Sequence, residues 1–415
     1  MRLFLAATLF SVPLTLGSCK RSNQPPSTSP QPASTSTPSS TGDRSEIQTV
    51  ENLLPTLPDR GAAMFFLASH YARLGDSTKA LARLKECISL HEGVDPTNDP
   101  AFKSLRSSPQ FEQLLQQIQH DYPPVHRARI VFTVQQADLF PEGLAADPTT
   151  RVFYLGSMHR KKILKISASG EASDFVPPDL YDLMPVGGLK VEPTDHSIWA
   201  ATDPGVRNRS ELVHFDKNGK LLERYPILAP GSHDLNDLVI RNAREIYTTD
   251  TFGHHVYRFD RQLHTFTPLT FSRPIFYPNG ITLSGDNNLL YVGDDLGVLI
   301  LDLRDNSARE VNPGEGNTLS GIDGLYWYKN SLLFVQYGTS AYRVARARLS
   351  PDGFRVISLE IFERGTSLVS DPTTGAILGS NFYFIANTGI YNLKDDTIID
   401  PAKLEPIHIA IVPLL

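Results

Sequence analysis

The chain has 415 residues, of which 40% are hydrophobic, and its formal net charge is −6. This length leaves room for more than one domain, and this composition supplies ample material for a core. A mild acidic excess without a long cluster of Lys and Arg argues against a nucleic-acid partner, because nucleic acids are held by concentrated positive charge.

The N-terminal residues, 1–18, have the pattern of a secretion signal. An apolar run from Leu3 to Leu16 follows one basic residue and is too short to span a bilayer stably. It ends in Leu16-Gly17-Ser18-Cys19, which looks like a bacterial lipobox, where the signal is cut before a cysteine that then carries lipid. We therefore expect Cys19 to anchor the chain on the extracytoplasmic side of a bacterial membrane, facing the periplasm or at the outer membrane. An ordinary secreted protein or a membrane-anchored one is the alternative.

Residues 19–44 contain the lipidated cysteine and a stretch of Ser, Thr and Pro with almost nothing apolar. Such a stretch cannot bury enough surface to offset chain entropy, so we expect a disordered tether that holds the folded part away from the lipid. Cys87 is then the only other cysteine, and no disulfide framework can form.

Residues 45–122 change to a helical period. Apolar side chains fall on one face between Ala63 and Leu74, Gly75-Asp76 makes a turn, and a second apolar face continues to Ile88, which predicts an αα-hairpin. The run from Ala68 to Leu81 resembles a tetratricopeptide repeat, but such repeats need roughly three units to build a stable array and one copy is present. We expect a small helical module that packs on or spaces the rest of the chain; a groove for a protein partner is the alternative.

Residues 127–415 are β-rich and carry a repeat. At Leu235-Asn236-Asp237-Leu238-Val239 a polar pair leads into a short apolar strand, and two more strands follow. Comparable units begin near Glu142, Gly188, Asn236, Asn279, Asp323 and Leu368. A period of about 40 to 50 residues with several strands in each unit is typical of propeller blades. The expected fold is therefore mainly β, a six-bladed β-propeller preceded by a small α-helical module.

A propeller must close its ring so that no long strand edge stays exposed. Either the strand near residues 128–134 or the one near residues 407–412, or both, should complete the last blade. Hairpin turns inside the blades are expected at three Gly-, Pro- or Asp-containing tetrapeptides. These are Asp147-Pro148-Thr149-Thr150, Ser284-Gly285-Asp286-Asn287 and Asp371-Pro372-Thr373-Thr374.

Polar residues recur at one point of the repeat, before the first strand. Glu142, Asn236, Asn279 and Asp323 hold this position in four units. First strands line the channel of a propeller, so these residues should converge at one mouth of it. Two carboxylates and two amide oxygens would make a site for a hard cation; calcium takes about six to eight oxygen ligands, which leaves places for water and substrate. Taken singly, Asn279 and Asp323 stand before glycine and could be turn residues, and Glu142 a surface acid.

Four motifs here resemble the metal-binding motifs of the gluconolactonase/regucalcin (senescence marker protein) propellers, with a leaning to the paraoxonase arm. They are Phe140-Pro141-Glu142-Gly143-Leu144, Leu235-Asn236-Asp237-Leu238-Val239, Pro278-Asn279-Gly280-Ile281 and Ile322-Asp323-Gly324. The resemblance covers roughly residues 130 to 395. It implies a divalent cation, calcium as a rule, on Glu142, Asn236, Asn279 and Asp323, with Asp323 both a ligand and the candidate general base. It also implies hydrolysis of a small lactone or related ester.

Two departures from the paraoxonase pattern stand out. Gly143 replaces an aspartate that helps to bind a second, structural calcium, although Asp237 is kept. The second unit begins with Gly187 and Gly188 where paraoxonases place a catalytic histidine. The second ion and the usual base are therefore in doubt.

Four more residues are candidates for the channel mouth besides Asp237: His233, Asp250, His254 and Asp294. The leading interpretation is a lipid-anchored, metal-dependent lactonase or esterase. The alternative is a non-catalytic ligand- or protein-binding propeller with a structural metal, since a fold alone does not decide function.

Overall fold

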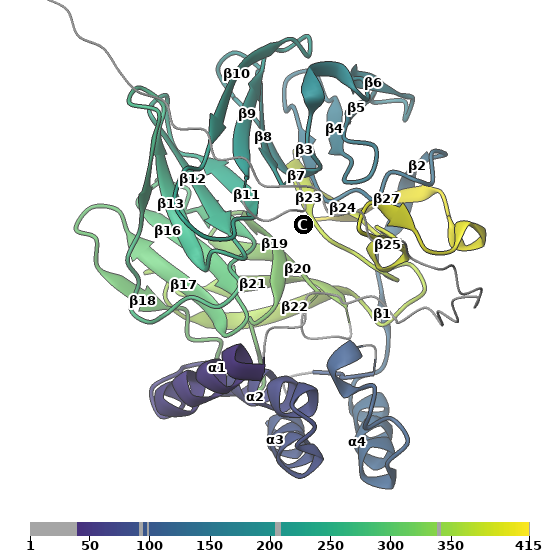
Figure 1. The fold of residues 1–415 in the computed structure, drawn as a ribbon, viewed down its shortest axis with the longest axis vertical. Coiled ribbons are helices and arrows are strands. Elements are labelled where there is room, and N and C mark those ends of the chain that lie inside the picture. Colours follow the sequence, from purple (N-terminus) through teal and green to yellow (C-terminus); the bar gives the residue numbers. More distant parts are fainter. Residues whose placement is uncertain (1–39, 91–93, 98, 204–208, 338–341, 415) are drawn as a thin grey trace, which may run out of the picture. The chain divides into compact units, whose positions relative to one another are not determined.

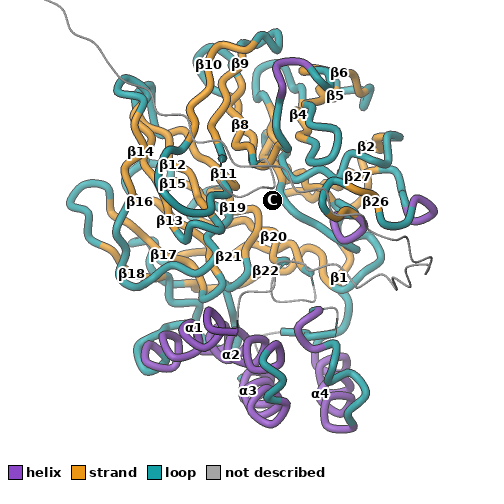
Figure 2. Tube along the Cα trace, viewed as in Figure 1, coloured by secondary structure: helices purple, strands orange, loops and turns teal. Residues whose placement is uncertain are grey.

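A computed structural model describes residues 40–90, 94–97, 99–203, 209–337 and 342–414. The predicted signal peptide, Cys19 and most of the predicted tether lie outside these ranges. Within them, no helix is both long enough and apolar enough to cross a membrane. Figure 2 shows the α-helices gathered in one part of the chain, whereas the strands lie in another together with the short 3-10 helices Leu180–Asp182, Ile390–Asn392 and Pro401–Lys403.

Four α-helices form the first part: α1 (Ser40–Leu53), α2 (Arg60–Arg73), α3 (Ser77–Ser89) and α4 (Pro109–Asp121). Asp59 and Asp76 cap α2 and α3 by accepting hydrogen bonds from the amides of Ala62 and Lys79, which otherwise lack partners in the first helical turn. Gly75 turns the chain between α2 and α3 with a φ of 79°, a conformation that glycine adopts without a steric penalty. The predicted αα-hairpin is therefore confirmed as α2 and α3.

The strands of the described part form six antiparallel blade sheets around a common centre (Figure 1). From inside outward, the first blade contains β3 (Leu144–Ala146), β4 (Phe153–Gly156), β5 (Ile163–Ile166) and β6 (Ala172–Val176), and the second contains β7 (Val186–Val191), β8 (Ile198–Thr202), β9 (Glu211–Phe215) and β10 (Leu221–Pro226). The third blade contains β11 (Leu235–Ile240), β12 (Glu245–Asp250), β13 (His255–Asp260) and β14 (Thr265–Pro268), and the fourth contains β15 (Ile281–Leu283), β16 (Leu289–Asp294), β17 (Gly297–Asp302) and β18 (Ala308–Glu310). The fifth blade contains β19 (Ile322–Trp327), β20 (Ser331–Gln336), β21 (Arg343–Leu349) and β22 (Val356–Arg364), and the sixth contains β23 (Gly375–Leu378), β24 (Asn381–Ile385), β27 (Ile407–Pro413) and β2 (Arg129–Val134).

The first strands of the six sheets contact one another in sequence: β3 with β7, then β11, β15, β19 and β23, which returns to β3. This closed ring confirms the predicted six-bladed propeller. A two-residue strand, β1 (Val125–His126), extends the fifth sheet beside β22, and β25 (Leu393–Lys394) and β26 (Thr397–Ile398) form a small separate ribbon.

Both terminal strands of the propeller complete the sixth blade. β27, near the C-terminus, pairs with β24 on one side and with β2 on the other. The strand that opens the propeller thus becomes the outer strand of its last sheet, which joins the first and last blades by main-chain hydrogen bonds. Of the ways of closing the ring that the sequence left open, the chain uses both strands together.

Two of the three predicted hairpin turns are confirmed and the third is wrong. Residues 147–150 join β3 to β4, and residues 284–287 join β15 to β16. Residues 371–374 instead precede β23, and Gly379 and Ser380 make the hairpin that follows it. The reason is a tertiary contact, because the Asp371 carboxylate accepts hydrogen bonds from Thr388 and Ile390 of a distant loop and none is found from its own turn among the described residues.

Aromatic side chains fill the spaces between blades. Trp199 in β8 is 1% exposed, stacks on Tyr225 of its own sheet and meets Phe259 of the next sheet with ring centroids 6.2 Å apart. Burying such a side chain contributes about 1.5–3 kcal/mol. These contacts fix each sheet against its neighbour and so fix the first strands around the channel.

The helices pack on loops of the propeller. Phe276 and Leu296 belong to the same apolar cluster as α2 and α3, and Phe66 meets Phe276 edge to face at 5.3 Å. The Asp59 carboxylate also accepts hydrogen bonds from the Leu319 amide (2.7 Å) and the Thr318 hydroxyl (3.0 Å). The loops concerned lead into β15 and β19, so the helices contact the end of the propeller at which Asn279 and Asp323 stand.

Candidate metal centre

The residues at the heads of the first strands form a contiguous ring. A Cβ placed on Gly143 would lie 2.0 Å from the carbonyl oxygen of Gly187, and one placed on Gly280 would lie 2.4 Å from that of Asp323. The Thr374 hydroxyl, at the head of β23, donates to the carbonyl oxygen of Glu142 and so closes the ring. The predicted convergence of the strand heads is present in the main chain.

Glu142 lies close enough to Asp323 for the negative charge of Asp323 to raise its pKa. Burial raises the pKa of Glu142 to about 8, assisted by the negative charges of Asp323, Asp371 and Asp203. No hydrogen bond to the Glu142 carboxylate is found among the described residues. A carboxylate surrounded by other acids is stabilised most by a cation, because a cation offsets both the lost hydration and the repulsion.

Asp323 is held in place by neighbouring blades. Its Oδ2 accepts a hydrogen bond of 2.5 Å from the Thr373 hydroxyl, and its carboxylate also takes one from the Asn279 side chain. Burial is the largest effect on Asp323 and raises its pKa to about 6; these two hydrogen bonds oppose the rise, and the charges of Asp237 and Asp371 add to it. Side chains of the fourth, fifth and sixth blades are therefore tied together at one point.

One of the two asparagines is placed as an acceptor. The Asn279 amide nitrogen is engaged with Asp323, whereas its Oδ1 is buried and has no hydrogen-bond partner among the described residues. Asn236 is the second residue of β11, half-buried, and no hydrogen bond of its side chain is found in the described part of the chain. Unpaired buried oxygens are uncommon in proteins and call for an unseen partner such as an ion or water.

Among the described residues, three such oxygens occur at this end of the propeller: Oδ1 of Asn279, Oδ2 of Asp237 and Oδ1 of Asp371. An oxygen-rich, acidic set in which these oxygens have no donor fits calcium, which prefers carboxylate and carbonyl oxygens. Over the described ranges, no three His, Cys, Asp or Glu side chains are close enough to hold a metal ion by themselves. An ion here would therefore depend on the asparagine oxygens as well as the carboxylates.

Asp237 faces the second blade and is paired with a lysine. Its Oδ1 lies 2.8 Å from Lys190 Nζ, and the Asp237 side chain is 1% exposed. Gly188 makes room for it, because a Cβ there would lie 2.6 Å from the same oxygen. The lysine ammonium also lies 5.6 Å from the centre of the Tyr326 ring. The Lys190 ammonium thus stands beside Asp237, the residue that the resemblance to paraoxonases links to a second calcium ion.

The remaining candidates hold loops in place. His233 and Asp250 contact each other at 2.5 Å, and Asp250 also accepts from the amides of Asp234 and Gly253. Asp294 is buried against the Arg273 guanidinium at 2.6 and 2.9 Å. These three side chains are bound to their own loops and not joined to the ring of strand heads by any contact found among the described residues.

His254 lies nearer to the helices. Its ring stands 4.5 Å from that of Tyr277, and its charge acts on Glu46 of α1. His254 is therefore placed at the contact between the propeller and the helical part.

Sequence reasoning missed Lys190 and the residues of the sixth-blade turn, Asp371, Thr373 and Thr374. Thr374-Gly375 has the pattern of Asn279-Gly280, a polar residue before glycine, but it follows Asp323 by 51 residues and so falls outside the repeat spacing. Lys190 lies two residues after Gly188 in β7, and alternation along a strand returns every second side chain to one face. That alternation was the available signal.

No family model and no curated protein matches the chain. Solved structures with a similar fold include a gluconolactonase from Xanthomonas campestris, with 15% identity, a TM-score of 0.49, and coverage of 71% of this chain and 98% of that chain. A virginiamycin B lyase from Staphylococcus aureus has 17% identity, a TM-score of 0.45, and coverage of 62% and 80%. A PQQ-bound aldose sugar dehydrogenase from Streptomyces coelicolor has 14% identity, a TM-score of 0.47, and coverage of 69% and 97%. Likeness at this level carries no information on the activity of this chain.

Proposed function

We propose that the strand heads hold one divalent cation, calcium in the first instance, and that the protein hydrolyses a lactone or a related ester. The observation that carries this proposal is the state of Glu142. Its carboxylate is surrounded by the charges of Asp323, Asp371 and Asp203 and has no hydrogen-bond donor among the described residues. The unpaired Oδ1 of Asn279 supports the same ion.

Glu142, Asn236, Asn279 and Asp323 would hold the cation. Such an ion polarises a carbonyl group and stabilises the negative charge that develops on its oxygen during attack by water. The chain's own residues hold this set in place: Thr373 and Asn279 fix the orientation of Asp323, and Thr374 ties the main chain of Glu142 to the sixth blade. Little reorganisation of the site is then needed when a substrate enters.

The test is turnover of a panel of sugar and aliphatic lactones by the purified protein, with and without a chelator. We expect chelator-sensitive hydrolysis of at least one lactone, restored by calcium. Asn279→Ala should lose activity and calcium affinity while its melting temperature in chelator stays near that of the wild type. Absence of turnover across the panel, in calcium and over pH 6 to 9, would refute the hydrolase.

A second candidate is a non-catalytic binding propeller in which the ion is structural. The feature that favours it is the second blade, where Gly187 and Gly188 provide no side chain to act as a base. For this candidate, Asp323→Ala should lower the melting temperature in calcium without any catalytic activity to lose. For the hydrolase, the same variant abolishes a turnover that the wild type shows, and its melting temperature in chelator stays near that of the wild type.

The lipid anchor and the helical part complete the proposal. Lipidation of Cys19 would place the enzyme on the extracytoplasmic side of a bacterial membrane. Mass spectrometry of the membrane fraction, comparing wild type with Cys19→Ser, tests this location. The tetratricopeptide-like character of α2 and α3, and a protein partner for them, are further proposals. The packing of these helices on the propeller favours a structural role for them over a partner-binding groove.

A further inference from the structure

The tetrapeptide Asp-Pro-Thr-Thr occurs twice in the chain and has two different roles. In the first copy, the Asp147 carboxylate accepts hydrogen bonds from the amides of Thr149 and Thr150 and from the Thr150 hydroxyl, and its Oδ2 also lies 3.1 Å from His196 Nδ1. In the second copy, at residues 371–374, the carboxylate is free of its turn and is held from outside it.

Asp371 is anchored by one oxygen and unpaired at the other. Its Oδ2 accepts from the Thr388 hydroxyl (2.6 Å) and the Ile390 amide (3.0 Å). Its Oδ1 is buried and has no hydrogen-bond partner in the described part of the chain. A carboxylate fixed in this way keeps its orientation and presents one oxygen that can accept a proton or a hydrogen bond.

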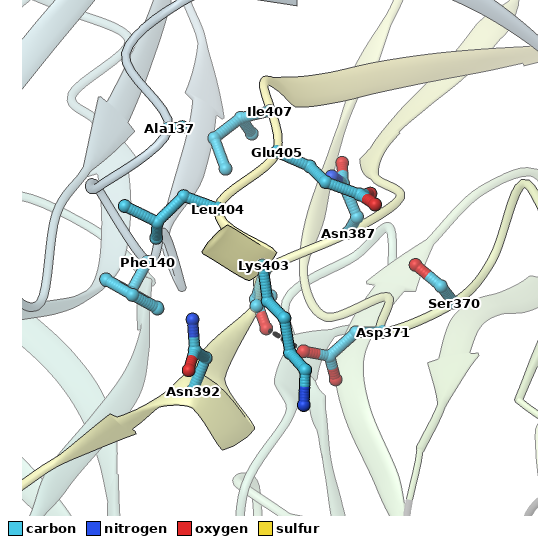
Figure 3. Close-up of a pocket in the computed structure, with 12 residues that line it drawn as sticks. Ala137, Phe140, Ser370, Asp371, Asn387, Asn392, Lys403, Leu404, Glu405 and Ile407 are labelled. Atoms are coloured by element: carbon cyan, nitrogen blue, oxygen red, sulfur yellow. Dashed lines mark hydrogen bonds between the residues drawn. The ribbon is translucent and has the colours of Figure 1, made fainter. Parts of the chain in front are cut away.

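A small cavity adjoins Asp371. The negative charge of Asp371 helps to raise the pKa of both Glu142 and Asp323. Its side chain also lines a cavity of about 100 Å³ together with Asn392 and Lys403, as Figure 3 shows. The cavity is polar on this side and large enough for water molecules, which need two to four polar partners each.

The turn that contains Asp371 also reaches the proposed ligands. Thr373, two residues on, donates to Asp323 Oδ2, and Thr374 donates to the carbonyl oxygen of Glu142. Pro372 between them fixes one backbone angle. The position of Asp371 relative to Glu142 and Asp323 is therefore set by a short, rigid and hydrogen-bonded segment.

From this geometry we propose that Asp371 is the proton acceptor of the hydrolysis, which leaves Asp323 to act only as a ligand. The inference rests on the proposed lactonase function and deepens it. It supplies from the sixth blade the base that the second blade, with Gly187 and Gly188, does not supply. A general base must stand within hydrogen-bond reach of the proton that it takes, and Oδ1 of Asp371 is an acceptor to which no described group donates.

The step balances without any further reactant. Asp371 Oδ1 takes one proton from a water molecule as the water oxygen forms a bond to the carbonyl carbon of the lactone. The bond between this carbon and the ring oxygen then breaks, and the departing alkoxide takes the proton from Asp371. The product is a hydroxy acid, which ionises in solvent, and Asp371 returns to its carboxylate form.

The experiment compares Asp371→Asn with Asp147→Asn, the same substitution in the same tetrapeptide. We expect Asp371→Asn to lower kcat by about 10²- to 10⁴-fold, the contribution typical of general acid–base catalysis. Its KM and its calcium dissociation constant, measured by calorimetry with calcium alone, should stay within about threefold of wild type. Asp147→Asn should leave all three constants unchanged.

Thr388→Val supplies a second test, because it removes the hydroxyl that orients Asp371 and keeps the carboxylate. An intermediate loss of kcat, with an unchanged calcium dissociation constant, is expected. Loss of the acidic limb of the kcat–pH profile in Asp371→Asn, but not in Thr388→Val, would identify the carboxylate as the base.

Three results would overturn the inference. A kcat of Asp371→Asn within threefold of wild type removes Asp371 from the reaction and leaves the lactonase standing. A calcium affinity weakened by tenfold or more makes Asp371 another ligand and not a base. A wild-type protein that hydrolyses no lactone removes the proposed function and this inference together, which distinguishes that failure from the first two.

Discussion

Replacement of Lys190 by methionine should destabilise the propeller, because it leaves the buried Asp237 carboxylate without its cation. The two groups are 2.8 Å apart, with side-chain exposures of 22% for Lys190 and 1% for Asp237. Breaking a fully buried pair costs about 3–5 kcal/mol, and an exposed pair contributes about 0.2–1 kcal/mol. Since the lysine is partly hydrated, we expect a loss of about 2–3 kcal/mol in the free energy of unfolding.

Thermal unfolding measures this loss. At about 2 °C for each kcal/mol in a domain of this size, Lys190→Met should lower the melting temperature by about 4–6 °C in chelator. Calcium should restore part of the stability, because a divalent ion can replace the missing ammonium beside Asp237. The double variant Lys190→Met with Asp237→Asn should recover at least half of the loss, since an amide carries no charge that needs a partner.

Lys162 provides the matched control. Its Nζ is also 2.8 Å from a carboxylate, that of Asp174. The Lys162 side chain is only 7% exposed, less than that of Lys190, but the Asp174 side chain is 39% exposed. Lys162→Met leaves a carboxylate that water can solvate, so its cost should stay below about 1 kcal/mol. Equal losses for the two lysine variants, or no recovery in the double variant, would show that the burial of Asp237 is not the cause.

Three further predictions concern Asn279, Glu142 and Asp59. Asn279→Ala should weaken calcium binding at least tenfold by calorimetry, and an unchanged affinity would exclude its Oδ1 as a ligand. The folded-state pKa of Glu142, about 8, exceeds its ordinary value of 4.5, so the folded state binds extra protons between these values. In chelator the melting temperature should therefore fall as pH rises from 5 to 8, and saturating calcium should remove this fall; equal slopes in the two buffers would contradict it. Asp59→Ala should lower the free energy of unfolding by about 2–4 kcal/mol, because it removes a helix cap together with the acceptor for the Leu319 amide. Asp76→Ala removes only a helix cap and should lower it by about 1 kcal/mol. Equal melting temperatures for the two variants would show that the contact of Asp59 with the propeller adds no stability.

The fold could be predicted from the sequence because the repeat recurs at regular intervals along the chain. The spacings of 43 and 44 residues from Asn236 to Asn279 and from Asn279 to Asp323 carry the same polar-then-apolar order, and each unit builds one sheet. The ring closure was readable only as a choice. Pairing between β2 and β27 joins residues about 275 positions apart, and two compatible edges do not by themselves show which one is used.

The site could be predicted where a residue shares its position in the repeat and was missed where the spacing changes. Glu142, Asn279 and Asp323 stand at corresponding points of their blades. The last strand of the fifth blade, β22, has nine residues where β14 has four and β18 has three, so Asp371 and Thr373 fall outside the period, and they could be connected to Asp323 only through tertiary hydrogen bonds. Periodicity predicts which strands meet, whereas the partners of an individual carboxylate depend on side chains from several blades.

The two Asp-Pro-Thr-Thr turns show how one local sequence acquires two roles. At Asp147 the turn joins two strands of one sheet, and the carboxylate accepts three hydrogen bonds within this turn and lies 3.1 Å from His196 Nδ1. At Asp371 the same residues connect two blades, Thr388 and Ile390 donate to one carboxylate oxygen, and no described group donates to the other. A buried acceptor without a donor reduces stability, so its presence here is better explained by a reacting water or an ion than by folding. The comparison of Asp371→Asn with Asp147→Asn therefore asks whether the position of this turn, and not its sequence, supplies the chemistry.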